Sequence, residues 1–121
     1  MTFGKRTFAR GRTQRPKHGA MNKMEASYGE LLEQRRIRGE VASYAFEAVK
    51  LKLAPLTFYT PDYRVILVDG TEEYHEVKGF WEDDARVKIK TAAVIHDCYV
   101  FRSVTRDRKT KGWKIEEVPA V

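Results

Sequence analysis

The sequence predicts an α/β domain over residues 21–121, preceded by a basic N-terminal arm over residues 1–20. Two segments carry apolar residues at helical spacing, several others have strand-like patterns, and the excess positive charge is confined to the arm. The expected order is a helix, a three-strand antiparallel unit, a second helix and a strand, with a further edge strand at the C-terminal end. A chain of 121 residues is long enough for one core of moderate size.

The arm accounts for the net charge of +6, because acidic and basic residues balance after residue 20. It has several glycines, few apolar residues and no helical or strand period, so we expect it to be disordered in isolation. A basic arm of this kind indicates a segment that contacts nucleic-acid phosphates. A tail without function, with Met21 as an alternative start, is the other interpretation. The basic residues of the arm are Lys5, Arg6, Arg10, Arg12, Arg15 and Lys17.

The first helix is expected to begin after Asn22 and to end at about Arg38, where Gly39 stops it. Asn22 and Glu25 have the spacing of a capping box, in which each side chain accepts a hydrogen bond from the backbone of the other. Glu25 has a second interpretation, as an acidic metal ligand beside the edge of the sheet. The apolar stripe of this helix consists of Met24, Tyr28, Leu31 and Leu32.

A strand is expected from Tyr44 to Leu53, where apolar residues alternate with lysines, and Pro55 ends it. Glu47 is the acid within this strand, and we interpret it as structural or as a support for the site rather than as catalytic. Towards the C-terminus, a charged loop from Arg106 to Lys111 precedes an edge strand from Trp113 to Val118.

Acidic residues at positions 82–84 open the second helix, as the helix dipole favours. Val87 and Val94 lie opposite its core stripe, which indicates packing on both sides and is consistent with contact with a second subunit. Three cations have two open interpretations, phosphate contact or an ordinary solvated helix face: Arg86, Lys88 and Lys90. The core stripe consists of Ala85, Ile89, Ala92 and Ala93.

The residues from Cys98 to Phe101 predict a buried strand that runs parallel to the preceding one. Cys98 is expected to be a buried core thiol, and a lone cysteine excludes an intramolecular disulfide. The chain has no apolar run of about twenty residues and no signal-peptide pattern. We therefore expect a cytoplasmic protein.

The central stretch from residue 59 to residue 81 predicts two strands around a turn at Asp69-Gly70. A strict two-residue loop would put Asp62 and Glu76 on opposite faces. A three-residue loop, with Gly70 in the left-handed region, puts Asp62 directly opposite Glu76, with Cβ atoms roughly 5 Å apart. Lys78 then projects from the same face as Glu76.

Two carboxylates this close repel each other unless a cation lies between them. Oxygen ligands with room left for water and phosphate suit Mg²⁺, with Mn²⁺ as a substitute. A lysine beside such an ion can stabilise charge on an attacked phosphate or orient the attacking water. An ordinary surface hairpin with scattered charges is the alternative.

Pro61-Asp62 followed by Glu76-Val77-Lys78 matches the PD-(D/E)XK pattern of Mg²⁺-dependent nucleases. Over roughly residues 22 to 105, the chain resembles the bacteriophage endonuclease I class of Holliday-junction resolvases and related small phage nucleases. The strings that carry this resemblance are Tyr59-Thr60-Pro61-Asp62-Tyr63, Glu76-Val77-Lys78-Gly79-Phe80-Trp81 and Asp83-Asp84-Ala85-Arg86. The resemblance implies a restriction-endonuclease-like core and a DNA endonuclease that cuts branched DNA as a homodimer, in the host cytoplasm if the chain is phage-encoded.

The resemblance also implies roles for individual residues. Asp62, Glu76 and the Val77 carbonyl would hold Mg²⁺, Glu25 would support a second ion or a bridging water, and Lys78 would orient the nucleophile or add positive charge. DNA contacts would come from the arm and the second helix, while Phe80 and Trp81 would cover the core or stack on bases. Two alternatives remain: a nuclease specific for single strands, flaps or nicked duplex, and a nucleic-acid-binding protein without catalysis.

Overall fold

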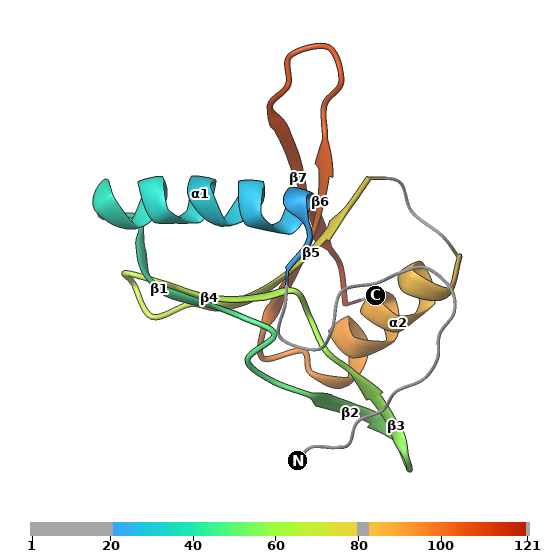
Figure 1. Ribbon diagram of the computed structural model, residues 1–121. Helices are drawn as coiled ribbons and strands as arrows, with labels where there is room; N and C mark the ends of the chain where they lie inside the picture. Colours follow the sequence, from blue (N-terminus) through green and yellow to red (C-terminus); the bar gives the residue numbers. More distant parts are fainter. Residues whose placement is uncertain (1–20, 80–82, 121) are drawn as a thin grey trace.

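The computed structural model describes residues 21–79 and 83–120. The basic arm, Phe80, Trp81 and Glu82 lie outside these ranges, so the expectations for them are not addressed by the structure. The elements are α1 (Lys23–Ile37), β1 (Val41–Phe46), β2 (Leu51–Ala54), β3 (Thr57–Tyr59), β4 (Tyr63–Leu67), β5 (Glu72–Lys78), α2 (Asp83–Ile95), β6 (Val100–Arg106) and β7 (Trp113–Val118) (Figure 1).

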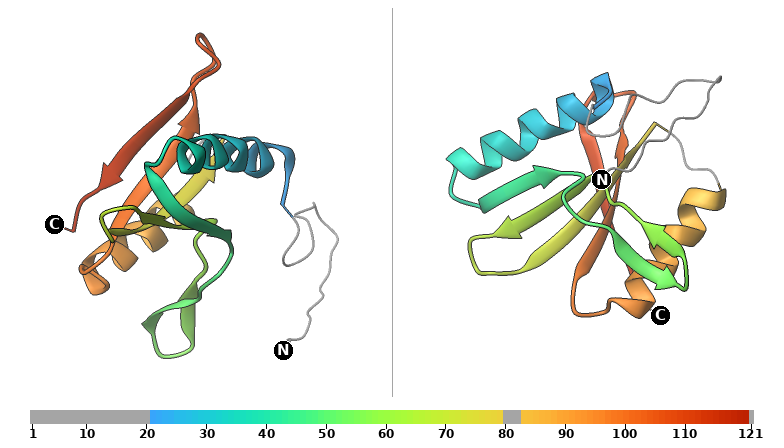
Figure 2. Two further views of the ribbon diagram at one scale, coloured as in Figure 1. Left: turned by 90° about the vertical axis from the view of Figure 1, so that its left-hand side faces the viewer. Right: turned by 60° about the horizontal axis from the view of Figure 1, so that its bottom comes forward.

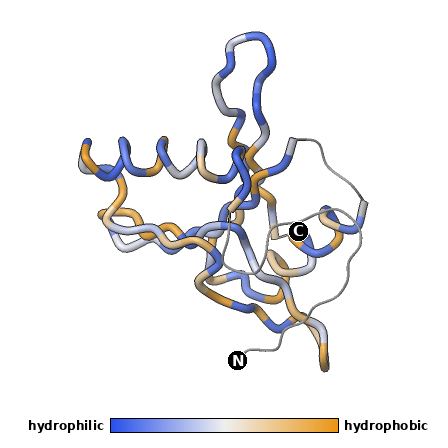
Figure 3. The backbone as a smooth tube through the Cα atoms, in the orientation of Figure 1, coloured by the Kyte–Doolittle hydropathy of each residue, from blue (hydrophilic) through white to orange (hydrophobic). Residues whose placement is uncertain are grey.

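Five strands form one mixed sheet in the order β1-β4-β5-β6-β7. The pair β5–β6 is parallel and is connected through α2, whereas the other pairs are antiparallel. The predicted α/β class is therefore confirmed, with a mostly antiparallel sheet, and so is the parallel register of β6. The strand β7 lies at one edge of the sheet, as expected, and the loop between β6 and β7 is hydrophilic (Figure 3).

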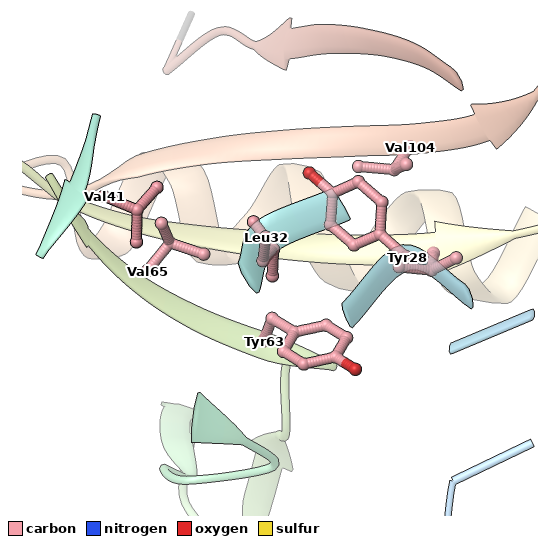
Figure 4. Packing of buried hydrophobic residues seen from close by; sticks show 7 residues of the cluster. Tyr28, Leu32, Val41, Tyr63, Val65 and Val104 are labelled. Atoms are coloured by element: carbon pink, nitrogen blue, oxygen red, sulfur yellow. The ribbon is translucent and has the colours of Figure 1, made fainter. Parts of the chain in front are cut away.

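The helix α1 covers one face of the sheet. Asn22 caps it in the predicted capping box with Glu25, and the chain leaves it through Gly39, whose φ is +85°. Tyr28 and Leu32 are fully buried against side chains of the sheet that include Tyr63, Val65 and Val104 (Figure 4). The predicted stripe is thus the core face of α1.

The helix α2 packs on the opposite face. Its residues Ile89, Ala92 and Ala93 are buried in a second cluster with Tyr74 and Phe101. Because side chains alternate along a strand, Tyr74 faces α2 while the next residue of β5 faces α1. The predicted core stripe of α2 is confirmed, and Val87 and Val94 on its other side are exposed.

The single strand expected from Tyr44 to Leu53 is wrong. The strand β1 begins earlier, at Val41, and ends at Phe46, where Glu47 adopts a φ of +48° and the chain leaves the five-stranded sheet. Alternation continued through this break, so the pattern did not reveal it.

The segment after the break forms a hairpin of β2 and β3 that was not predicted. It is a separate two-stranded sheet beside α2 (Figure 2). Pro55 follows the end of β2, as expected, and Leu56 at the tip has a φ of +59° and is almost fully exposed.

The expected buried thiol is also wrong, because Cys98 is exposed. The residues between α2 and β6 form a turn, in which the Tyr99 backbone N–H donates to the His96 carbonyl at 3.1 Å, and β6 starts only at Val100. The apolar run therefore began two residues before the strand. None of the helices in residues 21–79 and 83–120 is long and apolar enough to cross a membrane.

Candidate active site

The hairpin of β4 and β5 has the register of the three-residue loop, which is one of the two registers that the sequence allows and the one that the candidate site requires. Tyr63 pairs with His75 and Val65 pairs with Glu73, so the next outward pair is Asp62 with Glu76. The loop comprises residues 68–70, closed by a hydrogen bond from the Leu67 N–H to the Thr71 carbonyl at 2.9 Å. Gly70 has a φ of +92°, in the left-handed region that favours glycine.

Asp62 lies just before β4 and is buried, with 3% of its surface exposed. Its Oδ2 accepts a hydrogen bond from the Val77 backbone N–H at 2.8 Å. This contact ties the carboxylate of Asp62 to β5, beside Glu76. Glu76 is also buried, at 6% exposure, so the alternative of an ordinary surface hairpin does not hold.

Glu76 has a different partner on each carboxylate oxygen. The Tyr59 hydroxyl donates to Oε1 at 2.7 Å, and Lys78 Nζ lies 3.1 Å from Oε2. Lys78 is therefore on the same face as Glu76, as predicted, and its side chain is partly exposed. The site joins a buried carboxylate pair to one lysine that solvent can reach.

Negative charge dominates the surroundings of Asp62. Burial raises the pKa of Asp62, and so do the charges of Glu76 and Glu25; the Val77 N–H and Lys78 act in the other direction, and the resulting pKa is about 8. In the absence of a further cation, this carboxyl group is therefore largely protonated at neutral pH. A divalent cation would favour its ionised form, and carboxylate oxygens are the ligands that Mg²⁺ prefers.

Burial and the charges of Glu76 and Asp62 raise the pKa of Tyr59 well above 10, so its hydroxyl keeps its proton and donates. Tyr59 was part of the motif in the sequence, but no role was assigned to it there. Its contact depends on β3, an element that the strand pattern did not predict.

Glu25 is buried at 3% exposure, and its side chain is turned towards the start of its own helix. Its Oε1 accepts from the Asn22 N–H at 3.0 Å, and Asn22 Oδ1 accepts from the Glu25 N–H at 2.8 Å. The Tyr63 hydroxyl donates to the Glu25 carbonyl at 2.7 Å, which fixes the first turn of α1 over β4. The capping box is confirmed, and a ligand role for Glu25 stays a prediction.

In the part of the chain that the structure describes, no three His, Cys, Asp or Glu side chains form a metal-binding group. The structure brings together Asp62, Glu76 and Lys78, and it places Glu25 within electrostatic range of Asp62. Glu47 lies close by through its backbone, whose N–H donates to the Asp62 carbonyl at 2.8 Å. Glu47 is half-buried, and its expected structural or supporting role stays a prediction.

The cations predicted for DNA lie on the surface where the structure describes them: Arg86, Lys88 and Lys90 are all exposed along α2. The charged loop begins one residue later than expected, because β6 includes Arg106. The Arg106 guanidinium stacks 4.3 Å from the Trp113 ring and donates to Ser27 Oγ at 3.0 Å.

A buried polar network on the α1 face of β5 was missed by the sequence reasoning. His75 is fully buried: its Nδ1 lies 2.7 Å from the Tyr28 hydroxyl, and its Nε2 lies 2.8 Å from Glu73 Oε1. Arg102 on β6 completes the network, with Nη2 3.0 Å from Glu73 Oε2. The available signal was polar residues on both faces of one strand, which a half-solvated strand does not have.

Comparison of the chain with models of known protein families, with curated proteins and with solved structures finds no match. A function can therefore be inferred from the site itself and from the motif that builds it. Its distinctive feature is a buried carboxylate pair that is short of positive charge, with a lysine at its open side.

Proposed function

We propose that the chain is a Mg²⁺-dependent endonuclease that hydrolyses phosphodiester bonds in DNA, on a restriction-endonuclease-like core. The observation that carries the proposal is the buried pair of Asp62 and Glu76 beside Lys78. A buried carboxyl group with a raised pKa, such as that of Asp62, is typical of a functional site, because a purely structural role favours close pairing with a cation. The order of elements supports the proposal, since a hairpin bearing the acids leads through α2 to a parallel strand.

Each residue has a specific part in this reaction. The carboxylates of Asp62 and Glu76, with the Val77 carbonyl, would hold the ion. Bound Mg²⁺ supplies a water of lowered pKa and neutralises charge on the attacked phosphate. Lys78, with its side chain partly open to solvent, brings positive charge and hydrogen-bond donors to the same place, where they stabilise the negative charge of the transition state. Glu25 adds negative charge behind Asp62.

The substrate that we propose is branched DNA, as the resemblance to junction resolvases implies. The arm and the exposed cations of α2 would contact phosphates, and sequence-independent contacts of this kind recognise DNA shape rather than bases. The exposed Val87 and Val94 on the outer side of α2 favour a second copy of the chain as partner, since two cuts on opposed strands require two sites.

The experiment that tests the function is a cleavage assay with four-way junction, flap, single strand and duplex offered together in Mg²⁺. We expect the junction to be cut first, and Ca²⁺ to support binding without turnover. Preferred cutting of flaps or single strands would keep the chemistry and change the substrate. Binding without cleavage of any substrate, in Mg²⁺ and in Mn²⁺, would instead identify a nucleic-acid-binding protein without catalysis.

A further inference from the structure

The hydroxyl of Tyr59 makes a contact that core packing does not require. Tyr59 ends β3, is 6% exposed and packs in the α2-side cluster with Leu51 and Ile89. A phenylalanine would fill the same space. The hydroxyl, however, donates to Oε1 of Glu76 at 2.7 Å, so this tyrosine joins the hydrophobic core directly to the candidate active site.

This hydrogen bond restricts the orientation of the Glu76 carboxylate. A glutamate has three rotatable side-chain bonds. A buried glutamate without a fixed hydrogen-bond partner can therefore turn either carboxylate oxygen towards its neighbours. In this structure Oε1 of Glu76 accepts from the Tyr59 hydroxyl, and Oε2 of Glu76 faces Lys78. Groups that orient a ligand in this way set how well the ligand binds its ion.

The β2–β3 hairpin is the element that brings Tyr59 to this place. The strands β1 and β4 are neighbours in the sheet, yet the chain between them makes a second, separate sheet. Leu51 on β2 pairs with Tyr59 on β3, and Asp62 follows three residues later. The β2–β3 hairpin therefore positions Tyr59 relative to the carboxylates of Asp62 and Glu76.

We propose that Tyr59 is a positioning residue, which holds Glu76 in the orientation that binds a divalent cation. The inference rests on the proposed function, and it adds a residue and an element, the β2–β3 hairpin, to the machinery of that site.

Tyr74 provides a matched control. It is 2% exposed, belongs to the same cluster as Tyr59, and its hydroxyl also donates to a carboxylate, that of Glu72. Glu72 pairs with Arg64 at 2.9 Å and is not part of the site. Tyr59→Phe and Tyr74→Phe thus remove the same group from the same cluster, and only Tyr59→Phe removes it from Glu76.

The test is titration calorimetry of Mn²⁺ into the metal-free full-length protein, for the wild type and both variants. We expect Tyr59→Phe to weaken Mn²⁺ binding by about 10- to 100-fold, and Tyr74→Phe to match the wild type. In cleavage assays, Tyr59→Phe should raise the Mg²⁺ concentration at half-maximal rate, while the rate at saturating Mg²⁺ stays close to that of the wild type. Circular dichroism and thermal unfolding check that the variants remain folded.

Mn²⁺ affinity unchanged in Tyr59→Phe would overturn the inference while the proposed function stands. Leu51→Ala guards against a packing effect, because it loosens the same cluster and keeps the hydroxyl; an equal loss of affinity in that variant would also overturn the inference. A wild-type protein that neither binds Mn²⁺ nor cuts DNA would instead contradict the proposed function itself.

Discussion

Two carboxyl groups lie against β5, one on each face of the sheet. They are equally buried, but their pKa values are shifted in opposite directions. Glu73 faces α1 and Asp62 lies against the other end of β5; each is 3% exposed. The pKa of Glu73 is about 2, whereas the pKa of Asp62 is about 8. Burial therefore does not decide the charge of a carboxyl group in this fold.

The neighbours of the two groups explain the difference. Burial alone would raise the pKa of Glu73, but the hydrogen bonds from His75 and Arg102, together with the positive charge of Arg102, outweigh it. At Asp62, burial is reinforced by the charges of Glu76 and Glu25, and one backbone N–H with one lysine does not compensate. Glu73 has a counter-charge, Arg102, within the chain, whereas the single lysine at the Asp62 site does not balance the carboxylates there.

This contrast separates an acid that the fold neutralises from one that, under the proposed function, binds a cation. A carboxylate that the fold itself neutralises stabilises the native state and has little left to offer a ligand. A carboxylate pair that remains short of positive charge destabilises the metal-free protein and is ready for a cation.

The largest expected effect is on cleavage. Asp62→Asn and Glu76→Gln should lower the rate of junction cleavage by at least about 100-fold, because each removes a charge that acts in the transition state. Junction binding should persist or tighten, since negative charge facing the phosphates is removed. Glu73→Gln should leave the cleavage rate within about tenfold when assayed well below its unfolding temperature.

Gel-based cleavage and binding measurements on the three variants, at equal protein concentration, decide this prediction. Cleavage retained within about tenfold in Asp62→Asn or Glu76→Gln would remove the assignment of the site. A loss in Glu73→Gln as large as in Asp62→Asn would remove the distinction between the two faces.

The next effect is on stability in metal-free buffer. The pKa of Asp62 rises from 3.8 to about 8 on folding, so between these values the folded state binds more protons than the unfolded state. The contribution of Asp62 to the free energy of unfolding should therefore fall by several kcal/mol as pH rises from about 4 to about 8. Asp62→Asn should flatten this dependence and be more stable than the wild type at pH 8. Denaturant unfolding in EDTA measures the difference, and Mg²⁺ should reduce it.

Much of this site could be predicted from the sequence because it depends on turn and capping signals between residues that are close together in the chain. Asp69-Gly70 predicted the turn and allowed a two-residue or a three-residue loop, and the three-residue loop that forms sets Asp62 beside Glu76. The capping box at Asn22 and the helix stop at Gly39 likewise depend on residues a few positions apart. Local patterns of this kind were enough to predict the fold class, α1, the β4–β5 hairpin, α2 and β7.

The rest depends on contacts between distant segments. Tyr59 reaches Glu76 across 17 positions, and Tyr28 reaches His75 across 47. The strand breaks at Glu47, where a residue other than glycine adopts a positive φ. Because there is no glycine or proline at this position, the sequence did not indicate the break. Cys98 was expected in the core because the apolar run Tyr99-Val100-Phe101 follows it, but it precedes the strand and lies in a turn.

The third prediction concerns the stability that the charge of Glu73 contributes. Glu73→Gln should lower the free energy of unfolding at pH 7 by about 1–3 kcal/mol, because Arg102 and His75 lose a charged acceptor. The folded pKa, about 2, lies below the ordinary 4.5, so this stabilisation is complete above about pH 4.5 and is lost as pH falls towards 2. Wild-type and variant unfolding curves should therefore converge in acid. Glu72→Gln, on a partly exposed pair with Arg64, is the control and should cost less.

The smallest expected effect concerns the proton on His75. Glu73 is ionised at neutral pH and can only accept, so His75 Nε2 carries the hydrogen and Nδ1 accepts from the Tyr28 hydroxyl. Burial lowers the pKa of His75 despite the charge of Glu73, which keeps the ring neutral. Tyr28→Phe leaves Nδ1 buried without its donor, at a cost of about 1–2 kcal/mol.

Tyr44→Phe is the matched control, since the Tyr44 hydroxyl donates to the solvent-accessible Glu33 and water can replace it. Urea unfolding of the two variants gives the costs, and ¹⁵N NMR of the imidazole reports the tautomer directly. A wild-type ring protonated on Nδ1, or a Tyr28→Phe cost no greater than that of Tyr44→Phe, would contradict the network. Cleavage at saturating Mg²⁺ should be equal in both variants, because the Tyr28 hydroxyl contacts the structural face of β5 and not Glu76.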